Sequence, residues 1–141
     1  EEKMPVVKGI LETLGNPYQI IRAHNKQKYH SSLVMASNLV IGIYRIALSQ
    51  LGECGFSDST AEKVLQPLFL NNAQNLCQNG CLNALTGPVD RNDISTVEKH
   101  LSVIENEDAL KLYKILSKEL IDIAENKYPN RDYSELKNVL R

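Results

Sequence analysis

The residues best suited to chemistry lie in one stretch, residues 84–101 (ALTGPVDRNDISTVEKHL), between segments with helical periodicity. Arg91 carries a planar guanidinium that suits a carboxylate or phosphate group of a ligand. The same arginine can instead pair with Asp90 or Asp93 and hold the turn, with His100 supporting the turn through a hydrogen bond. Taken alone, these residues favour an architectural loop over a catalytic one.

Turn and capping residues frame this stretch. Gly87-Pro88 breaks the chain, and either Asp93 or Ser95 is suited to cap the helix that follows. Ser95 and Glu98 have the spacing of a capping box, in which the two side chains satisfy each other's backbone amides. We therefore expect a turn and then a short helix ending near Ile104.

A second group of polar residues falls on an apolar segment. His30, Ser37 and Asn38 are spaced i, i+7 and i+8, so on one continuous helix they share a side. Polar side chains on such a stripe need hydrogen-bond partners. Either Ser37 and Asn38 bond backbone carbonyls in a core while His30 lies at the surface, or the three residues contact a ligand.

Cysteine and glycine patterns predict neither a metal site nor a nucleotide site within the chain. Cys77 and Cys81 lie four residues apart, but zinc needs four matched ligands and no histidine is near in sequence, so we expect buried structural cysteines. The seven glycines form no G-x-G-x-x-G spacing and no phosphate-binding loop. We expect no dinucleotide to bind to this chain alone.

The periodicity predicts a mostly helical fold. A helix over residues 5–14 stops at Gly15, Asn16-Pro17 makes a turn, and residues 18–22 are rich in strand formers. With no initiator methionine at its start, the chain is expected to begin inside the tail of an upstream α/β domain. The further helices are expected over residues 26–51, 59–80 with a kink at Pro67, 95–104, 107–126 and 132–141.

Composition restricts the class of protein. The 141 residues carry a net charge of −1, which gives no electrostatic bias toward nucleic acid. Residues 31–52 are apolar, but Asn38 and Arg45 fall within them, and a central arginine costs about 2.5 to 3.5 kcal/mol on membrane-insertion scales. We therefore expect no membrane span. This central helix is apolar on both flanks, which predicts that neighbouring helices or a second subunit wrap it. Three cysteines and no signal peptide favour the cytoplasm.

Three sequence strings carry a resemblance to a known family: KYHSSLVMASNLV (28–40), LQPLFLNNAQN (65–75) and GCLNALTGPVDRNDISTVEKHL (80–101). They resemble the C-terminal helical domain of a poorly characterised family of Rossmann-like NAD(P)-dependent oxidoreductases. That family is similar in layout to pyrroline-5-carboxylate reductase, ketopantoate reductase and the C-terminal fold of 6-phosphogluconate dehydrogenase. Asn92 stands where the family usually carries glycine, and asparagine also tolerates left-handed backbone angles.

The resemblance implies a helical bundle of the 6-phosphogluconate dehydrogenase C-terminal-like type. Residues 1–24 would be the tail of the Rossmann-like domain, and residues 25–141 the helical dimerisation and substrate domain of a homodimer. NAD or NADP would bind only in the full-length protein, and the chain alone would be inactive. His30 and Asn38 would be catalytic residues. The implied substrate-binding residues are Ser37, Thr86, Arg91 and Asp93.

The other function that we consider is a helical interaction or dimerisation module with no catalytic role. In that case His30, Asn38 and Arg91 are structural. The two functions differ in one respect that a longer sequence would reveal: the oxidoreductase requires an upstream G-x-G-x-x-G, whereas the interaction module does not.

Overall fold

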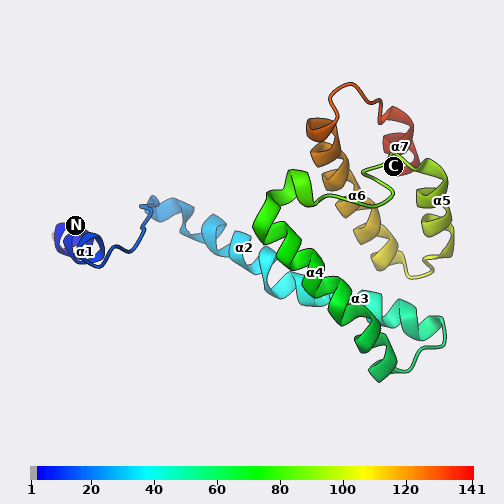
Figure 1. The fold of residues 1–141 in the computed structure, drawn as a ribbon, viewed down its shortest axis with the longest axis horizontal. Coiled ribbons are helices and arrows are strands. Elements are labelled where there is room, and N and C mark those ends of the chain that lie inside the picture. The colour runs from blue at the N-terminus through cyan, green and yellow to red at the C-terminus, as the bar shows by residue number, and fades with distance from the viewer. Residues whose placement is uncertain (1–2) are drawn as a thin grey trace. The chain divides into compact units, whose positions relative to one another are not determined.

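The computed structural model describes residues 3–141 and confirms the mostly helical fold. Its elements within that range, labelled in Figure 1, are α1 (Met4–Thr13), the 3-10 turn η1 (Ala23–Asn25), α2 (Lys26–Ala36), α3 (Asn38–Glu53), α4 (Asp58–Ala84), α5 (Ile94–Val103), α6 (Glu107–Lys127) and α7 (Ser134–Val139).

The strand predicted over residues 18–22 is wrong. These residues have no regular structure, and within residues 3–141 no strand forms. A strand satisfies its backbone amides and carbonyls only by pairing with another strand, and no partner strand is present among the described residues. The preceding helix, α1, is confirmed, with Pro5 in its first turn and Gly15 just beyond its end at φ 67°.

The single helix predicted over residues 26–51 is also wrong, because the structure divides it at Ser37. The backbone there has φ −123° and ψ −73°, so α2 ends and α3 begins. The Ser37 hydroxyl donates to the carbonyl of Leu33 at 2.7 Å and to Oδ1 of Asn38 at 3.0 Å. A serine hydroxyl that bonds the carbonyl four residues earlier is known to bend helices.

The expected burial of this helical segment by neighbouring helices is not observed. None of the residues of α1, α2 or α3 is buried. By length and composition the helical stretch Ala23–Glu53 could cross a membrane: the mean hydropathy of its most apolar window of 18 residues is 1.5, and none of that window is buried. A single helix of this kind is weak evidence for a membrane span. Its apolar side chains are therefore exposed or at most half-buried in the described part of the chain.

The kink in α4 lies at Gly80 rather than at Pro67. Pro67 is inside the helix, whereas the non-helical backbone angles are those of Gly80, at φ 70° and ψ 171°. Glycine has no Cβ atom, so it adopts this left-handed φ without the steric cost that other residues meet. The last turn of α4 after Gly80 is thereby redirected before the chain enters the next loop.

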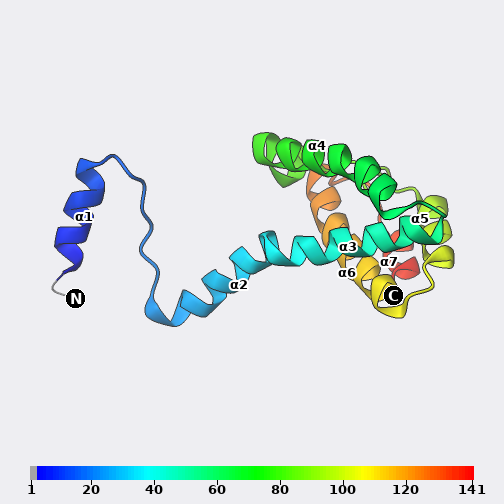
Figure 2. The ribbon, with the colours of Figure 1, turned by 90° about the horizontal axis from the view of Figure 1, so that it is seen from below.

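The chain forms two units, one that ends at Arg45 and one that runs from Ile46 to Arg141. The second unit holds the hydrophobic core. In it α4 packs against α6 and α5 against α7, as Figures 1 and 2 show. The core comprises Leu85, Val89, Val97, Ile121, Ala124, Tyr133, Leu136 and Leu140.

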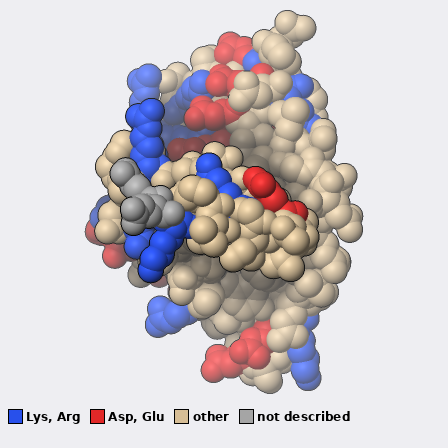
Figure 3. All heavy atoms as spheres, turned by 90° about the vertical axis from the view of Figure 1, so that its left-hand side faces the viewer, with Lys and Arg blue, Asp and Glu red and all other residues tan. Residues whose placement is uncertain are grey.

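Charged side chains of both signs are spread over the molecular face drawn in Figure 3, with wide uncharged areas between them. Glu107 and Lys111 on α6 form an ion pair at 3.6 Å, four residues apart, and both side chains are exposed. Exposed pairs of this kind stabilise proteins very little. Such surface pairs therefore contribute little to holding the fold.

Candidate functional site

The loop between α4 and α5, residues 85–93, is the centre of the candidate site, and we call it the signature loop. Its backbone turns twice through left-handed angles, with Gly87 at φ 96° and Asn92 at φ 55°. The amide of Asp93 donates to the carbonyl of Pro88 at 2.8 Å, and that of Arg91 to Gly87 at 3.2 Å. The expectation that an asparagine at position 92 preserves this turn is confirmed.

Asp93 begins α5. Its Oδ1 accepts from the backbone amide of Thr96 at 3.1 Å, and its Oδ2 from the Thr96 hydroxyl at 2.7 Å. These two bonds, the hydroxyl first, lower the pKa of the Asp93 carboxyl. The alternative cap at Ser95 is wrong, as is its capping box with Glu98, because Ser95 already lies inside the helix. Asp93, two residues earlier, is the cap because it directly precedes the helix and its backbone is still non-helical.

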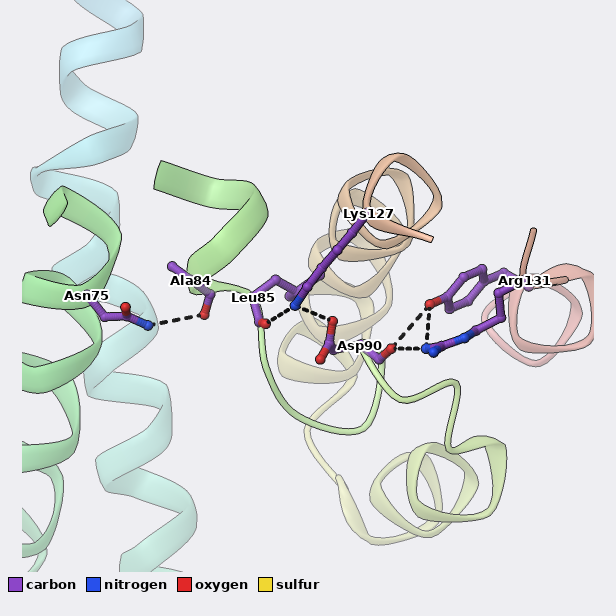
Figure 4. Close-up of polar contacts among 7 residues, drawn as sticks. Asn75, Ala84, Leu85, Asp90, Lys127 and Arg131 are labelled. Atoms are coloured by element: carbon purple, nitrogen blue, oxygen red, sulfur yellow. Dashed lines mark hydrogen bonds and ion pairs between the residues drawn. The ribbon is translucent and has the colours of Figure 1, made fainter. Parts of the chain in front are cut away.

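Lys127, at the end of α6, forms hydrogen bonds with two residues of the signature loop. Its Nζ donates to the carbonyl of Leu85 and to Oδ1 of Asp90, both at 2.9 Å. Figure 4 shows the ammonium group between these two oxygens. Only 22% of the lysine side chain and 13% of the aspartate side chain are exposed. The bond to Asp90 raises the pKa of Lys127.

Side chains of the segment after α6 form hydrogen bonds with the backbone of the signature loop. The carbonyl of Asp90 accepts from Arg131 and from the hydroxyl of Tyr133, the latter at 3.2 Å (Figure 4). The Asn92 side chain donates to the carbonyl of Asp132 at 2.9 Å. Tyr133 itself is a core residue, only 1% exposed. The loop is thus fastened at both ends of its turn.

A further amide forms a hydrogen bond within α4, just before the signature loop begins. Asn75 donates to the carbonyl of Ala84 at 3.4 Å, across the kink of the helix (Figure 4). Asn79 in turn donates to Oδ1 of Asn75 at 2.7 Å, and Asn83 donates to the carbonyl of Asn79 at 3.2 Å. This series of asparagines continues the helix's hydrogen bonding past Gly80.

Two side chains of the signature loop remain exposed, Thr86 and Arg91. Among residues 3–141 the Arg91 guanidinium forms no hydrogen bond or ion pair, so its predicted pairing with Asp90 is wrong; its charge acts on Asp93 at longer range. Lys127 takes the place expected for Arg91. A cavity of about 330 Å³ lies beside Thr86, and its lining includes Asn72, Leu76, Leu85, Thr86, Leu120 and Ile123.

His100 does not support the turn as predicted. Its Nδ1 lies 2.8 Å from the hydroxyl of Tyr113 on α6, and the two rings meet edge to face. A contact between His100 and the loop was expected because the two are close in sequence. In the structure His100 lies on the side of α5 that contacts α6.

The remaining predicted residues lie in the other unit, on or between α2 and α3. His30 is on α2, Ser37 at the break and Asn38 at the start of α3, and all three are exposed. Because the helix breaks at Ser37, the spacing of one regular helix no longer relates His30 to Asn38. Ser37 and Asn38 bond each other, and no hydrogen bond joins either of them to His30 within residues 3–141.

The cysteines are exposed, which contradicts their predicted burial. Cys54, Cys77 and Cys81 are free thiols and all three are exposed, whereas burial was predicted for Cys77 and Cys81. In the described part of the chain, no group of three histidine, cysteine, aspartate or glutamate side chains is placed to hold a metal ion.

Reasoning from the sequence missed the residues that hold the signature loop. Lys127, Arg131 and Tyr133 lie 37 to 43 residues from their partners, as the bonds to Asp90 show. No local pattern marks such a contact. The available signal was general: a lysine in the last turn of a helix is well placed to bond carbonyl groups.

A comparison with protein families gives one match. A family model described as "Domain of unknown function (DUF2520)" matches residues 1–120. No curated protein matches the chain, and no solved structure matches it.

Proposed function

The chain belongs to the DUF2520 family, a domain of unknown function, and we propose that it is the dimerisation and substrate-cleft domain of an NAD(P)-dependent oxidoreductase. In this proposal the bundle is of the 6-phosphogluconate dehydrogenase C-terminal-like type. The cofactor would supply hydride to a small keto or imino compound. The chain has no G-x-G-x-x-G, so another segment or chain would hold the cofactor.

The observation that carries the proposal is the way the signature loop is held. Lys127, Arg131 and Asn92 fix its backbone, while Thr86 and Arg91 are left exposed on the same turn. Binding sites commonly place polar contact residues on a rigid scaffold of this kind. Thr86 would contact substrate in the cavity beside it, and Arg91 would bind a carboxylate or phosphate of the substrate. Asp93 would contribute through the helix that it caps.

The proposed catalytic residues belong to the other unit. His30 would donate a hydrogen bond to the carbonyl or imine that accepts hydride, and so favour the charge that develops there. Asn38 would orient the substrate, with Ser37 beside it. These roles rest on analogy with two-domain reductases that the chain resembles in sequence.

A homodimer is part of the proposal, because the exposed apolar side chains of α2 and α3 need cover. They include Leu33, Met35, Leu39, Ile41 and Ile43, each at least 40% exposed. Exposed apolar patches of this extent mark interaction surfaces. Ile41→Glu should give monomers in sedimentation velocity at micromolar concentration, whereas Val103→Glu on α5 should leave dimers. A wild-type chain that sediments only as a monomer, or that partitions into lipid vesicles, would contradict the dimer.

Calorimetric titration with NADPH and NADH tests the enzymatic part. It should be carried out on this chain and on a longer parent protein that includes a nucleotide-binding segment. We expect binding by the parent and none by the chain alone. His30→Ala and Asn38→Ala should then reduce turnover of keto or imino substrates in the parent, while Ser31→Ala, a neighbouring control, should not. Absence of binding by both proteins would refute the oxidoreductase.

The second candidate is a helical interaction module without catalysis. One observation favours it: the bonds of Asp90, Asn92 and Asp93 are all made within the protein and hold the fold. This candidate predicts that Thr86→Val and Arg91→Met leave every activity of the parent unchanged.

A further inference from the structure

A second cavity, of about 580 Å³, lies within the unit Ile46–Arg141, away from the signature loop. It is bounded by the end of α3, the end of α5 with the residues after it, and the middle of α6. The residues that matter for its chemistry are Glu53, His100, Val103, Ile104, Glu105 and Tyr113. No part of the proposed function uses this cavity.

The charge of the lining has one sign. Glu53 and Glu105 contribute carboxylates, while no lysine or arginine lines the cavity. Neither glutamate forms an ion pair or hydrogen bond within residues 3–141, so both remain available to a ligand. A concave surface lined by charges of one sign concentrates ligands of the opposite sign.

The rest of the lining is apolar or held in place. Val103 and Ile104 provide aliphatic surface, and Val103 is 69% exposed. The bond of 2.8 Å between His100 and Tyr113 fixes the two rings of the wall against each other. Small-molecule sites typically combine an apolar lining with a few placed polar groups, as this cavity does.

A metal ion is a poor fit for the same residues. Metal sites need three or more ligands that converge on one point. In the part of the chain that the structure describes, no three histidine, cysteine or acidic side chains do so. An organic cation has no such requirement, because its ammonium group can approach one carboxylate while its carbon chain covers the apolar wall.

We propose that this cavity binds a small aliphatic amine, with its ammonium group at Glu53 and Glu105 and its methylene chain along Val103 and Ile104. The geometry selects a cation with a short carbon chain over a neutral or anionic compound of the same length. The site is independent of nucleotide binding and of the proposed catalytic residues.

The test is a titration of the whole chain with butan-1-amine, followed by the imidazole signals of histidine in NMR spectra. The chain has three histidines, so His24 and His30 are internal controls for His100. We expect saturable shifts at His100 alone. Butan-1-ol and butyrate, which share the carbon chain without the positive charge, should give no saturable shift.

Matched variants locate the charges. Glu53→Gln and Glu105→Gln should each weaken binding of butan-1-amine about two- to fivefold, the range for exposed ion pairs. Glu98→Gln, an exposed acid of α5 outside the cavity, should leave affinity unchanged. Val103→Lys should abolish binding without loss of fold, because that side chain is mostly exposed.

Three results would overturn the proposal. They are equal shifts at all three histidines, equal affinity for butan-1-ol, and a loss in Glu98→Gln as large as that in Glu53→Gln. Circular dichroism of each variant establishes that it is folded. If Glu53→Gln is unfolded, Val103→Lys alone decides, and unchanged binding in that variant refutes the site.

Discussion

The unit that ends at Arg45 and the unit that begins at Ile46 have the same helical periodicity but different burial. The first contains no buried residue among those described, and even its apolar side chains Val6, Ile10 and Ile41 are more than half exposed. The second buries Ile121, Leu136 and Leu140 completely. Apolar periodicity therefore predicts where a helix forms and which side is apolar, but not whether the same chain covers that side.

The difference matters because helices depend on packing for stability. α1 has 10 residues and α2 has 11. Isolated helices shorter than about 12 to 15 residues are marginal in water. The first unit is thus expected to gain most of its order from a partner, whereas the second carries its own core.

The largest effect should come from the same substitution made in both units. Ile121→Ala should lower the free energy of unfolding by about 3 kcal/mol, since it leaves a cavity in the core. Ile10→Ala should change it by less than about 0.5 kcal/mol, because that side chain is already exposed. Urea titrations followed by circular dichroism measure both. A similar loss in the two variants would break the comparison between the units.

A smaller effect is expected at the anchor of the signature loop. Lys127→Met leaves the Leu85 carbonyl and the Asp90 carboxylate without their shared donor, so it should lower Tm clearly. Lys111→Met, which removes only exposed pairs, should lower it far less. The raised pKa of Lys127 means that its contribution is complete below the ordinary value of 10.5 and is lost as the pH rises through the higher folded value. Differential scanning calorimetry at neutral and strongly alkaline pH tests both statements.

The left-handed turn of the loop gives the next effect. Asn92→Ala loses the bond to Asp132 and places a Cβ-bearing residue without a local polar group at φ 55°. We expect a loss of about 2 kcal/mol, of which Asn92→Gly should recover about 1 kcal/mol by relieving the backbone. Equal stability of the alanine and glycine variants would mean that the turn carries no strain. The same urea titration measures the pair.

The smallest effect depends on the charge of Asp93. Because the pKa of Asp93 is lowered, its contribution to stability is present above the ordinary value of 3.8 and is lost as the pH falls through the lower folded value. Asp93→Asn keeps an acceptor for the Thr96 amide but removes the charge, so at neutral pH it should lose about as much stability as the wild type loses on acidification. Its stability should decline less steeply below pH 3.8 than that of the wild type. Asp108→Asn, at an exposed position, should follow the wild type in thermal melts across this range.

The sequence predicted features that depend on near neighbours. Gly15 and Asn92 adopt the left-handed angles expected of them, and Asp93 was one of two predicted caps. The strand at residues 18–22 failed because strand formation depends on a partner that periodicity does not reveal. The single helix predicted over residues 26–51 failed for a different reason: a hydrogen bond from the Ser37 hydroxyl back to Leu33 bends the helix without changing its apolar pattern.

The candidate site was predicted only in part. The motif located the signature loop correctly, because turn and capping residues have local meaning. Its fastening by Lys127, Arg131 and Tyr133 depends on how α6 packs against the end of α4, which is a property of the folded core. Arg91 was given the role of Lys127 because it is nearer in sequence to Asp90.

The bonds from Lys127, Arg131 and Tyr133 also determine the smallest length of chain that can fold properly. A protein shortened at residue 126 would keep every residue of the signature loop, yet it would lose all three side chains that fasten it. It would lose the core residues Leu136 and Leu140 as well. We expect such a shortened protein to be cleaved rapidly by proteases within residues 85–93. The last fifteen residues are thus required to keep the signature loop ordered.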